Sequence, residues 1–156
     1  SQDISSAPLD YQTHRFQDLL KEIIQCCQER MIHESEKFGL PQAELRCLML
    51  FEGERYLTVK VISHKLDVAK SRVTKIVEGL LKKEMVHRTE DPEDARVKLI
   101  GLTPKGRKKA QEVTRFIRDS HEKVLLQMAP SERKGILSSL ENLRSCMEVV
   151  KSQLKT

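Results

Sequence analysis

The chain has 156 residues, of which 38% are apolar, 33% are charged and 4% are aromatic, and it contains no Trp. This length fits one domain with a substantial core, and the composition is typical of helical proteins rather than aromatic-rich β-sandwiches. The longest apolar run, residues 47–51, is far shorter than the roughly 18 residues that a bilayer-spanning helix needs. The first ten residues lack the features of a signal peptide, so we expect a cytoplasmic location.

Positive charge is concentrated in the middle of the chain. Residues 60–109 contain fourteen Lys or Arg and seven Asp or Glu, whereas the remainder contains fourteen basic and sixteen acidic residues. A middle segment of +7 beside flanks of −2 favours a module that binds a polyanion. The alternative is a basic surface that is merely solvated.

Two helices are expected before residue 53. Residues 11–38 carry apolar side chains at the three-and-four spacing of one helix face, and Gly39 is expected to end this helix. Pro41 suits the first turn of a second helix to about residue 52, which Gly53 ends. The first apolar face consists of Phe16, Leu19, Leu20, Ile23, Ile24, Cys27, Met31 and Ile32, and the second of Leu45, Leu48, Met49 and Phe51.

A helix-turn-helix pattern follows. Thr58 is a suitable N-cap for a short third helix, and Asp67 and Val68 form a tight turn after it. A fourth helix is expected over residues 70–83. The side chains expected to be buried are Val59, Ile62 and Leu66 in the third helix, and Val73, Ile76, Val77, Leu80 and Leu81 in the fourth.

Two β-rich segments, residues 86–91 and 95–102, flank an acidic turn that contains Pro92, and they predict a hairpin. The alternation is only partly regular. It places Val97, Leu99 and Gly101 on one face, and Arg96, Lys98, Ile100 and Leu102 on the other.

Two long helices are expected at the C-terminal end. Thr103 and Pro104 start one that runs to about residue 128, and the last begins near Ser131 after a break at Pro130. Its apolar residues step by 4, 3, 4, 3 and 4, which is the spacing of a helix that packs on a partner. We expect the first helix and a second copy of the chain to supply that partner, whereas a purely intramolecular core is the alternative. This seam consists of Ile136, Leu140, Leu143, Met147, Val150 and Leu154.

The fourth helix has the properties of one that enters the major groove of DNA. Its apolar side would anchor it, and its N-terminal half carries cationic and hydroxyl side chains that suit base and phosphate contacts. These candidate DNA-binding residues are Lys70, Ser71, Arg72, Thr74 and Lys75. A hairpin directly after a helix-turn-helix is the winged-helix order, which supports this interpretation.

Residues 68–106 resemble the recognition helix and wing of the MarR family of bacterial transcriptional regulators. The wing motif consists of Asp91-Pro92, Asp94-Ala95-Arg96 and Leu102-Thr103-Pro104-Lys105-Gly106. The resemblance implies a homodimer whose first and last helices interdigitate. Two positions depart from the family pattern: Ala69 replaces the usual Ser cap, and Glu84 occupies a glycine position.

The expected fold class is mainly α, an α+β winged helix-turn-helix. Residues 39–106 would form the DNA-binding lobe, and residues 1–38 and 107–156 the helical dimerisation region. The resemblance implies that Arg96 at the wing enters the minor groove, and Asp94 is placed to hold its guanidinium. Arg88 and Lys98 are candidate phosphate contacts. We expect a repressor on a pseudo-palindromic operator, released by a small-molecule effector of a kind that nothing in the sequence identifies.

The four cysteines do not indicate a metal site. Cys26 and Cys27 are adjacent and Cys47 and Cys146 are isolated, so we expect buried thiols and neither a metal nor a cofactor. The alternative is a thiol-based redox-sensing regulator that uses Cys26 or Cys27. A winged helix that binds protein instead of DNA is a further alternative. An enzyme is not expected, because no triad, dyad, metal-ligand spacing or Gly-rich phosphate loop is present.

Overall fold

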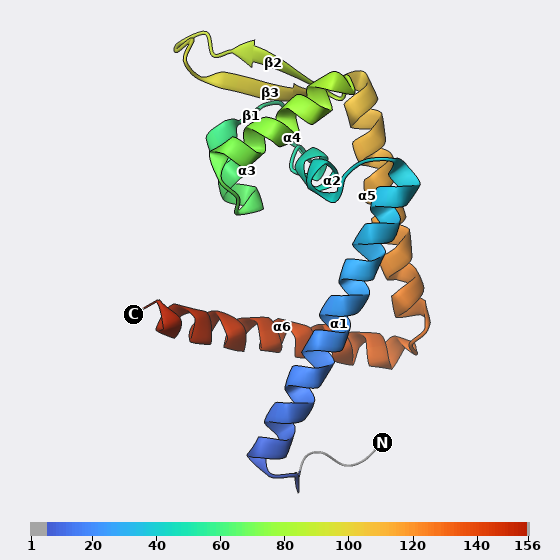
Figure 1. Cartoon of the computed structure of the whole chain (residues 1–156). Helices are drawn as coiled ribbons and strands as arrows, with labels where there is room; N and C mark the ends of the chain where they lie inside the picture. Colours follow the sequence, from blue (N-terminus) through green and yellow to red (C-terminus); the bar gives the residue numbers. More distant parts are fainter. Residues whose placement is uncertain (1–5, 156) are drawn as a thin grey trace. The chain divides into compact units, whose positions relative to one another are not determined.

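The structure is a computed structural model that describes residues 6–155. Over these residues the chain forms six helices and three short strands (Figure 1). Their order is α1 (Leu9–Phe38), α2 (Gln42–Met49), β1 (Leu57–Thr58), α3 (Val59–Leu66), α4 (Lys70–Lys82), β2 (Val86–Glu90), β3 (Lys98–Leu102), α5 (Pro104–Leu126) and α6 (Pro130–Leu154). A mainly helical chain with one small antiparallel sheet confirms the predicted winged-helix class. The chain divides into two compact units, with the boundary between Val113 and Thr114 inside α5.

Backbone hydrogen bonds mark the ends of the first two helices. Gly39 adopts the left-handed conformation with φ 65°, and its N–H donates to the Ser35 carbonyl, as expected of a helix-ending glycine. The prediction for α2 was wrong at its end, because the helix stops at Met49 rather than near residue 52. There the Leu50 N–H donates to the Cys47 carbonyl, which tightens the last turn before Gly53 reverses the chain with φ 76°.

The helix-turn-helix forms as predicted. Thr58 caps α3, since its Oγ1 accepts from the Val61 N–H at 3.2 Å. Asp67 turns the chain in the left-handed conformation. Figure 1 shows α2, α3 and α4 gathered beneath the small sheet. The most completely buried side chains of this lobe are Cys47, Leu48, Ile62, Val73, Leu80 and Ile100. Burying a Val, Leu or Ile side chain contributes about 1.5–3 kcal/mol, so this cluster provides much of the stability of the lobe.

The sheet has the order β1–β3–β2 and is antiparallel throughout. In β3 Ile100 is fully buried and pairs with Leu57 on one side and Arg88 on the other. On the opposite face Gly101 lies under the ring of His87. The His87 and Tyr56 rings meet edge to face, with their centroids 5.9 Å apart. Both faces of β3 are therefore covered near its end, which explains why its alternation was only partly regular.

Both departures from the family pattern have local consequences. Ala69 offers no side-chain acceptor to the first turn of α4. Glu84 has φ 58°, so a non-glycine residue occupies a strained conformation there. The Thr103 hydroxyl donates to the Glu84 carbonyl at 2.6 Å, and this bond from the start of α5 helps to hold the turn.

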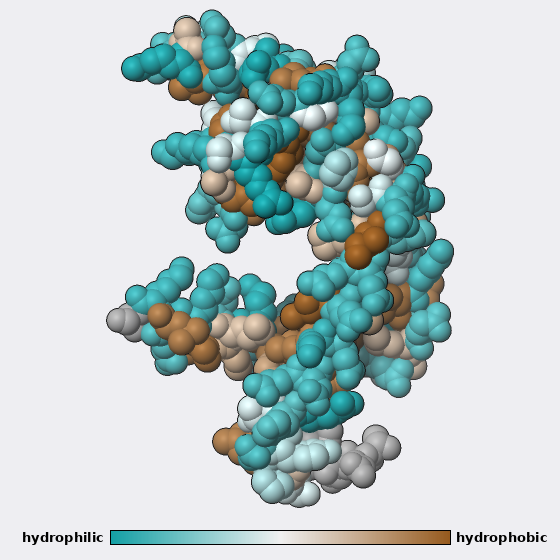
Figure 2. Space-filling view, in the orientation of Figure 1, coloured by the Kyte–Doolittle hydropathy of each residue, from teal (hydrophilic) through white to brown (hydrophobic). Residues whose placement is uncertain are grey.

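The terminal helices present apolar side chains to solvent, each within its own unit. On α1, Phe16, Leu19, Ile23 and Ile24 are exposed. No residue that the structure describes in α6 is buried, and Leu140 is 50% exposed. Figure 2 shows hydrophobic surface along both helices. The predicted apolar faces therefore exist, and each is largely exposed within its own unit.

Candidate nucleic-acid interface

The exposed side of α4 carries all five residues that the sequence assigned to the major groove. Its opposite side is buried through Val73, Ile76, Val77 and Leu80. The side chains of Lys70, Ser71, Arg72, Thr74 and Lys75 are exposed. Within the described residues no ion pair involves Arg72 or Lys75, so both cationic groups are available to an anionic partner. The Thr74 hydroxyl donates to the Lys70 carbonyl at 3.1 Å, and its oxygen can still accept a hydrogen bond.

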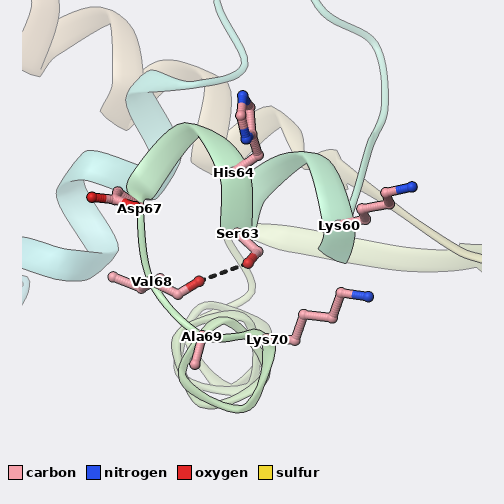
Figure 3. Close-up of a pocket in the computed structure, with 7 residues that line it drawn as sticks. All are labelled: Lys60, Ser63, His64, Asp67, Val68, Ala69 and Lys70. Carbon is pink, nitrogen blue, oxygen red and sulfur yellow. Dashed lines mark hydrogen bonds between the residues drawn. The ribbon is translucent and has the colours of Figure 1, made fainter. Parts of the chain in front are cut away.

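Lys60 is a further candidate DNA contact that the sequence analysis did not identify. It lines an open hollow at the turn between α3 and α4. Figure 3 shows Lys60 of α3 and Lys70 of α4 extending on the same side of this hollow, with Asp67 on the other side. The Ser63 hydroxyl donates to the Val68 carbonyl at 2.6 Å and fixes the turn. Lys60 is exposed, at the start of the helix that precedes the recognition helix. Its place in the basic segment was visible in the sequence, but its position beside Lys70 depends on the turn.

An ion pair that sequence reasoning also missed anchors α4 on α2. Lys83 Nζ lies 2.6 Å from Glu44 Oε2, and the Glu44 side chain is only 9% exposed. Gly79 of α4 faces this carboxylate, and a side chain at position 79 would overlap Glu44 Oε1. The C-terminal end of the recognition helix is therefore held by a half-buried charge pair as well as by apolar packing.

At the wing, Asp94 and Arg96 form the predicted pair. Arg96 Nε lies 3.0 Å from Asp94 Oδ1, and Arg96 Nη2 lies 3.0 Å from Asp94 Oδ2, which is the two-pronged geometry. The Arg96 side chain is 90% exposed. The hydrogen bond from the Arg96 side chain lowers the pKa of the Asp94 carboxyl below its ordinary value. A carboxyl whose pKa is lowered by folding stabilises the fold at any pH above its ordinary pKa. This stabilisation is lost as the pH falls through the lowered pKa, so the Asp94–Arg96 pair is intact at neutral pH.

Arg88 and Lys98, the two candidate phosphate contacts of the wing, differ in their surroundings. Arg88 is exposed on β2. Lys98 is not simply extended into solvent, because its Nζ lies 2.7 Å from Glu90 Oε1 and 3.0 Å from the Ala95 carbonyl oxygen. The structure therefore places the Lys98 ammonium against the wing itself, where a phosphate would compete with two existing contacts.

Comparison with known proteins identifies the family. A sequence model of the MarR family matches residues 38–97, which span α2, the helix-turn-helix and most of the wing. The transcriptional regulator AdcR of Streptococcus pneumoniae is 31% identical over 107 residues, covering 67% of this chain and 73% of AdcR. The chain belongs to the MarR family.

Further relatives agree with this assignment. The HTH-type transcriptional repressor MdtR of Bacillus subtilis is 32% identical over 60% of this chain and 61% of MdtR. The structure of Streptococcus pneumoniae FabT in complex with DNA has a TM-score of 0.74 and 24% identity, over 88% of this chain and 99% of FabT, and shows the shared fold. This member of the MarR family is a DNA-binding transcriptional regulator and not an enzyme.

The thiols of this MarR-family chain do not match the expectation of burial. Cys47 is buried, but Cys26, Cys27 and Cys146 are exposed. Burial raises the pKa of Cys47 from 9.0 to about 12, with a further contribution from the charge of Glu44. Since the unfolded thiol ionises first, Cys47 lowers the stability of the fold as pH rises from about 9 towards 12. At neutral pH it stays protonated and unreactive.

Among the residues that the structure describes, no three His, Cys, Asp or Glu side chains are grouped closely enough to hold a metal ion. No helix in residues 6–155 combines the length and apolar character needed to cross a bilayer.

Proposed function

We propose that the chain acts as a homodimeric repressor on a pseudo-palindromic DNA operator and is released by a small-molecule effector. The proposal rests on one observation: the same lobe exposes two cationic elements, the N-terminal half of α4 and the wing arginine Arg96. In the proposed complex each α4 occupies a major groove, with two half-sites about one helical turn apart. Arg96 enters the flanking minor groove, where narrow A·T-rich DNA concentrates negative potential.

The relatives support parts of this proposal. The FabT structure contains DNA, and MdtR is named a repressor. We further propose the functional division into a DNA-binding lobe of residues 39–106 and a dimerisation region of residues 1–38 and 107–156. An effector that alters the separation of the two lobes would prevent both recognition helices from reaching their grooves together, and repression would be lifted.

Arg72→Ala tests the base contact. A two-pronged arginine–guanine contact contributes about 1–3 kcal/mol, so we expect roughly 5- to 150-fold weaker binding and relaxed selectivity at one base pair. The measurement is fluorescence anisotropy at fixed salt with a duplex selected from random-sequence DNA by repeated binding, called the selected duplex below. Lys82→Ala is the matched control, because it removes one exposed charge from the other end of α4. Equal losses in both variants would contradict a base-specific role for Arg72.

Asp94→Ala tests the support of the wing arginine. Removal of a negative charge would by itself favour binding to DNA, but the guanidinium also loses the two contacts that direct it. We therefore expect about three- to tenfold weaker binding. The same titration with the selected duplex measures it, and tighter binding by Asp94→Ala would refute the pairing.

A thiol-based redox trigger is the second candidate, and the exposure of Cys26 and Cys27 on α1 favours it. If it operates, mild peroxide abolishes binding of the selected duplex, thiol reductant restores it, and a Cys26→Ser/Cys27→Ser variant stays bound throughout. Cys47 is buried and serves as the internal control, because mass spectrometry should find it unmodified. Binding of the wild-type protein that is insensitive to peroxide would eliminate this candidate.

A further inference from the structure

One peptide group of the wing is held from both sides. The Arg96 N–H donates to Asp94 Oδ1 at 3.0 Å, and the carbonyl of the same peptide group, that of Ala95, accepts from Lys98 Nζ at 3.0 Å. A peptide group is planar, so contacts to its N–H and its C=O together fix the orientation of the plane. Together with the φ angle of Arg96, that plane sets the direction in which the Arg96 side chain leaves the backbone.

The Lys98 ammonium is itself held by Glu90. These two residues are opposite each other at the end of the β2–β3 ladder, and Lys98 Nζ lies 2.7 Å from Glu90 Oε1. The hydrogen bond from Lys98 lowers the pKa of Glu90, so the carboxylate is charged at neutral pH. Lys98 ends in a flexible four-carbon stem, and without Glu90 only the Ala95 carbonyl would retain its ammonium.

We propose that Glu90 and Lys98 are positioning residues, which hold the Ala95–Arg96 peptide so that Arg96 is directed at the DNA. This inference rests on the proposed function, in which Arg96 contacts the minor groove. It assigns Lys98 a role within the wing instead of the phosphate contact that the sequence suggested. It also gives Glu90 a role that the proposal does not give to Asp91 or Glu93 of the same turn.

The two roles for Lys98 predict opposite effects of removing Glu90. If Lys98 contacts a phosphate, Glu90 competes with that phosphate, and Glu90→Ala strengthens binding. If the pair positions Arg96, Glu90→Ala weakens binding although the wing becomes more positive. The sign of the change therefore distinguishes the two roles.

Glu93→Ala is the matched control. Glu93 is exposed in the same turn, and its carboxylate makes no ion pair within the described residues; only its N–H is engaged, donating to Asp91 Oδ1. Exposed ion pairs contribute little, so we expect Glu90→Ala to bind the selected duplex only about two- to fivefold more weakly. Glu93→Ala is expected to bind equally well or slightly more tightly. Unchanged or tighter binding by Glu90→Ala would overturn the proposal.

A double-mutant cycle tests whether Glu90 acts through Arg96. In an Arg96→Ala background the effect of Glu90→Ala should disappear. A double exchange, Glu90→Lys with Lys98→Glu, should not restore binding, because a carboxylate at position 98 cannot donate to the Ala95 carbonyl. An undiminished effect in the Arg96→Ala background would overturn the positioning role, as it would indicate a general effect on the lobe. If Arg96→Ala alone binds normally, the proposed minor-groove contact fails as well, so the two failures are distinguishable.

Discussion

Leu140→Lys is expected to convert the protein into a monomer that no longer binds its operator tightly. Leu140 is central in the apolar series of α6 and is 50% exposed in the single chain. A dimer made by the uncovered faces of α1 and α6 would bury this side chain in both copies. Replacing it with lysine removes two apolar contacts and places two cations in an apolar interface.

The expected size of this effect follows from burial. Complete burial of a leucine contributes about 1.5–3 kcal/mol, and the dimer would bury only the half of Leu140 that the single chain exposes. A homodimer loses this contribution twice, roughly 1.5–3 kcal/mol in all, in addition to the cost of the two cations. The dissociation constant of the dimer should rise at least about 10-fold. Because the proposed operator has two half-sites, a monomer would bind one of them only, and the affinity gained from joining two lobes would be lost.

Sedimentation equilibrium over a range of concentrations measures the change, and titration of the selected duplex follows its consequence. Ser138→Lys is the matched control, since it adds the same charge to α6 at an exposed position on the side of the helix away from Leu140. We expect Ser138→Lys to remain dimeric. Indistinguishable assembly of Leu140→Lys and the parent protein would contradict the proposed interface.

Local sequence rules predicted the lobe well wherever short-range chemistry decides the structure. Thr58 caps α3, Gly39 ends α1 and the apolar side of α4 is buried, because each depends on residues only a few positions apart. The Asp94–Arg96 pair was predictable for the same reason. These elements needed no knowledge of the rest of the chain.

The features that the sequence did not predict depend on contacts between distant segments. β1 has only two residues and exists because β3 lies beside it. Glu44 and Lys83 are 39 positions apart, and no local pattern marks them as partners. The exposure of Cys26 and Cys27 could not be judged from helical periodicity, since periodicity identifies an apolar face but not what covers it.

Gly106→Ala is expected to destabilise the fold by about 3 kcal/mol, although alanine is the better helix former. Gly106 lies in the first turn of α5, where intrinsic propensity favours alanine over glycine by up to about 1 kcal/mol. A side chain there would overlap the Met85 carbonyl oxygen. That oxygen also accepts the Thr103 N–H at 3.1 Å, so it cannot move without breaking this bond. Overpacking of this kind typically costs about 1–3 kcal/mol and sometimes more.

Gly135→Ala provides the matched control, because a side chain at this position in α6 meets no atom within 4 Å. There helix propensity acts alone, and the substitution should be neutral or stabilising by up to about 1 kcal/mol. Thermal unfolding at equal protein concentration measures both effects. Relative to the parent protein, the midpoint should be roughly 6–12 °C lower for Gly106→Ala and unchanged or higher for Gly135→Ala. An unchanged midpoint for Gly106→Ala would show that α5 can move away from Met85. The glycine of the wing motif is thus explained by the close approach of α5 to the segment between α4 and the wing. Loss of this contact would loosen both of the elements that we propose to bind DNA.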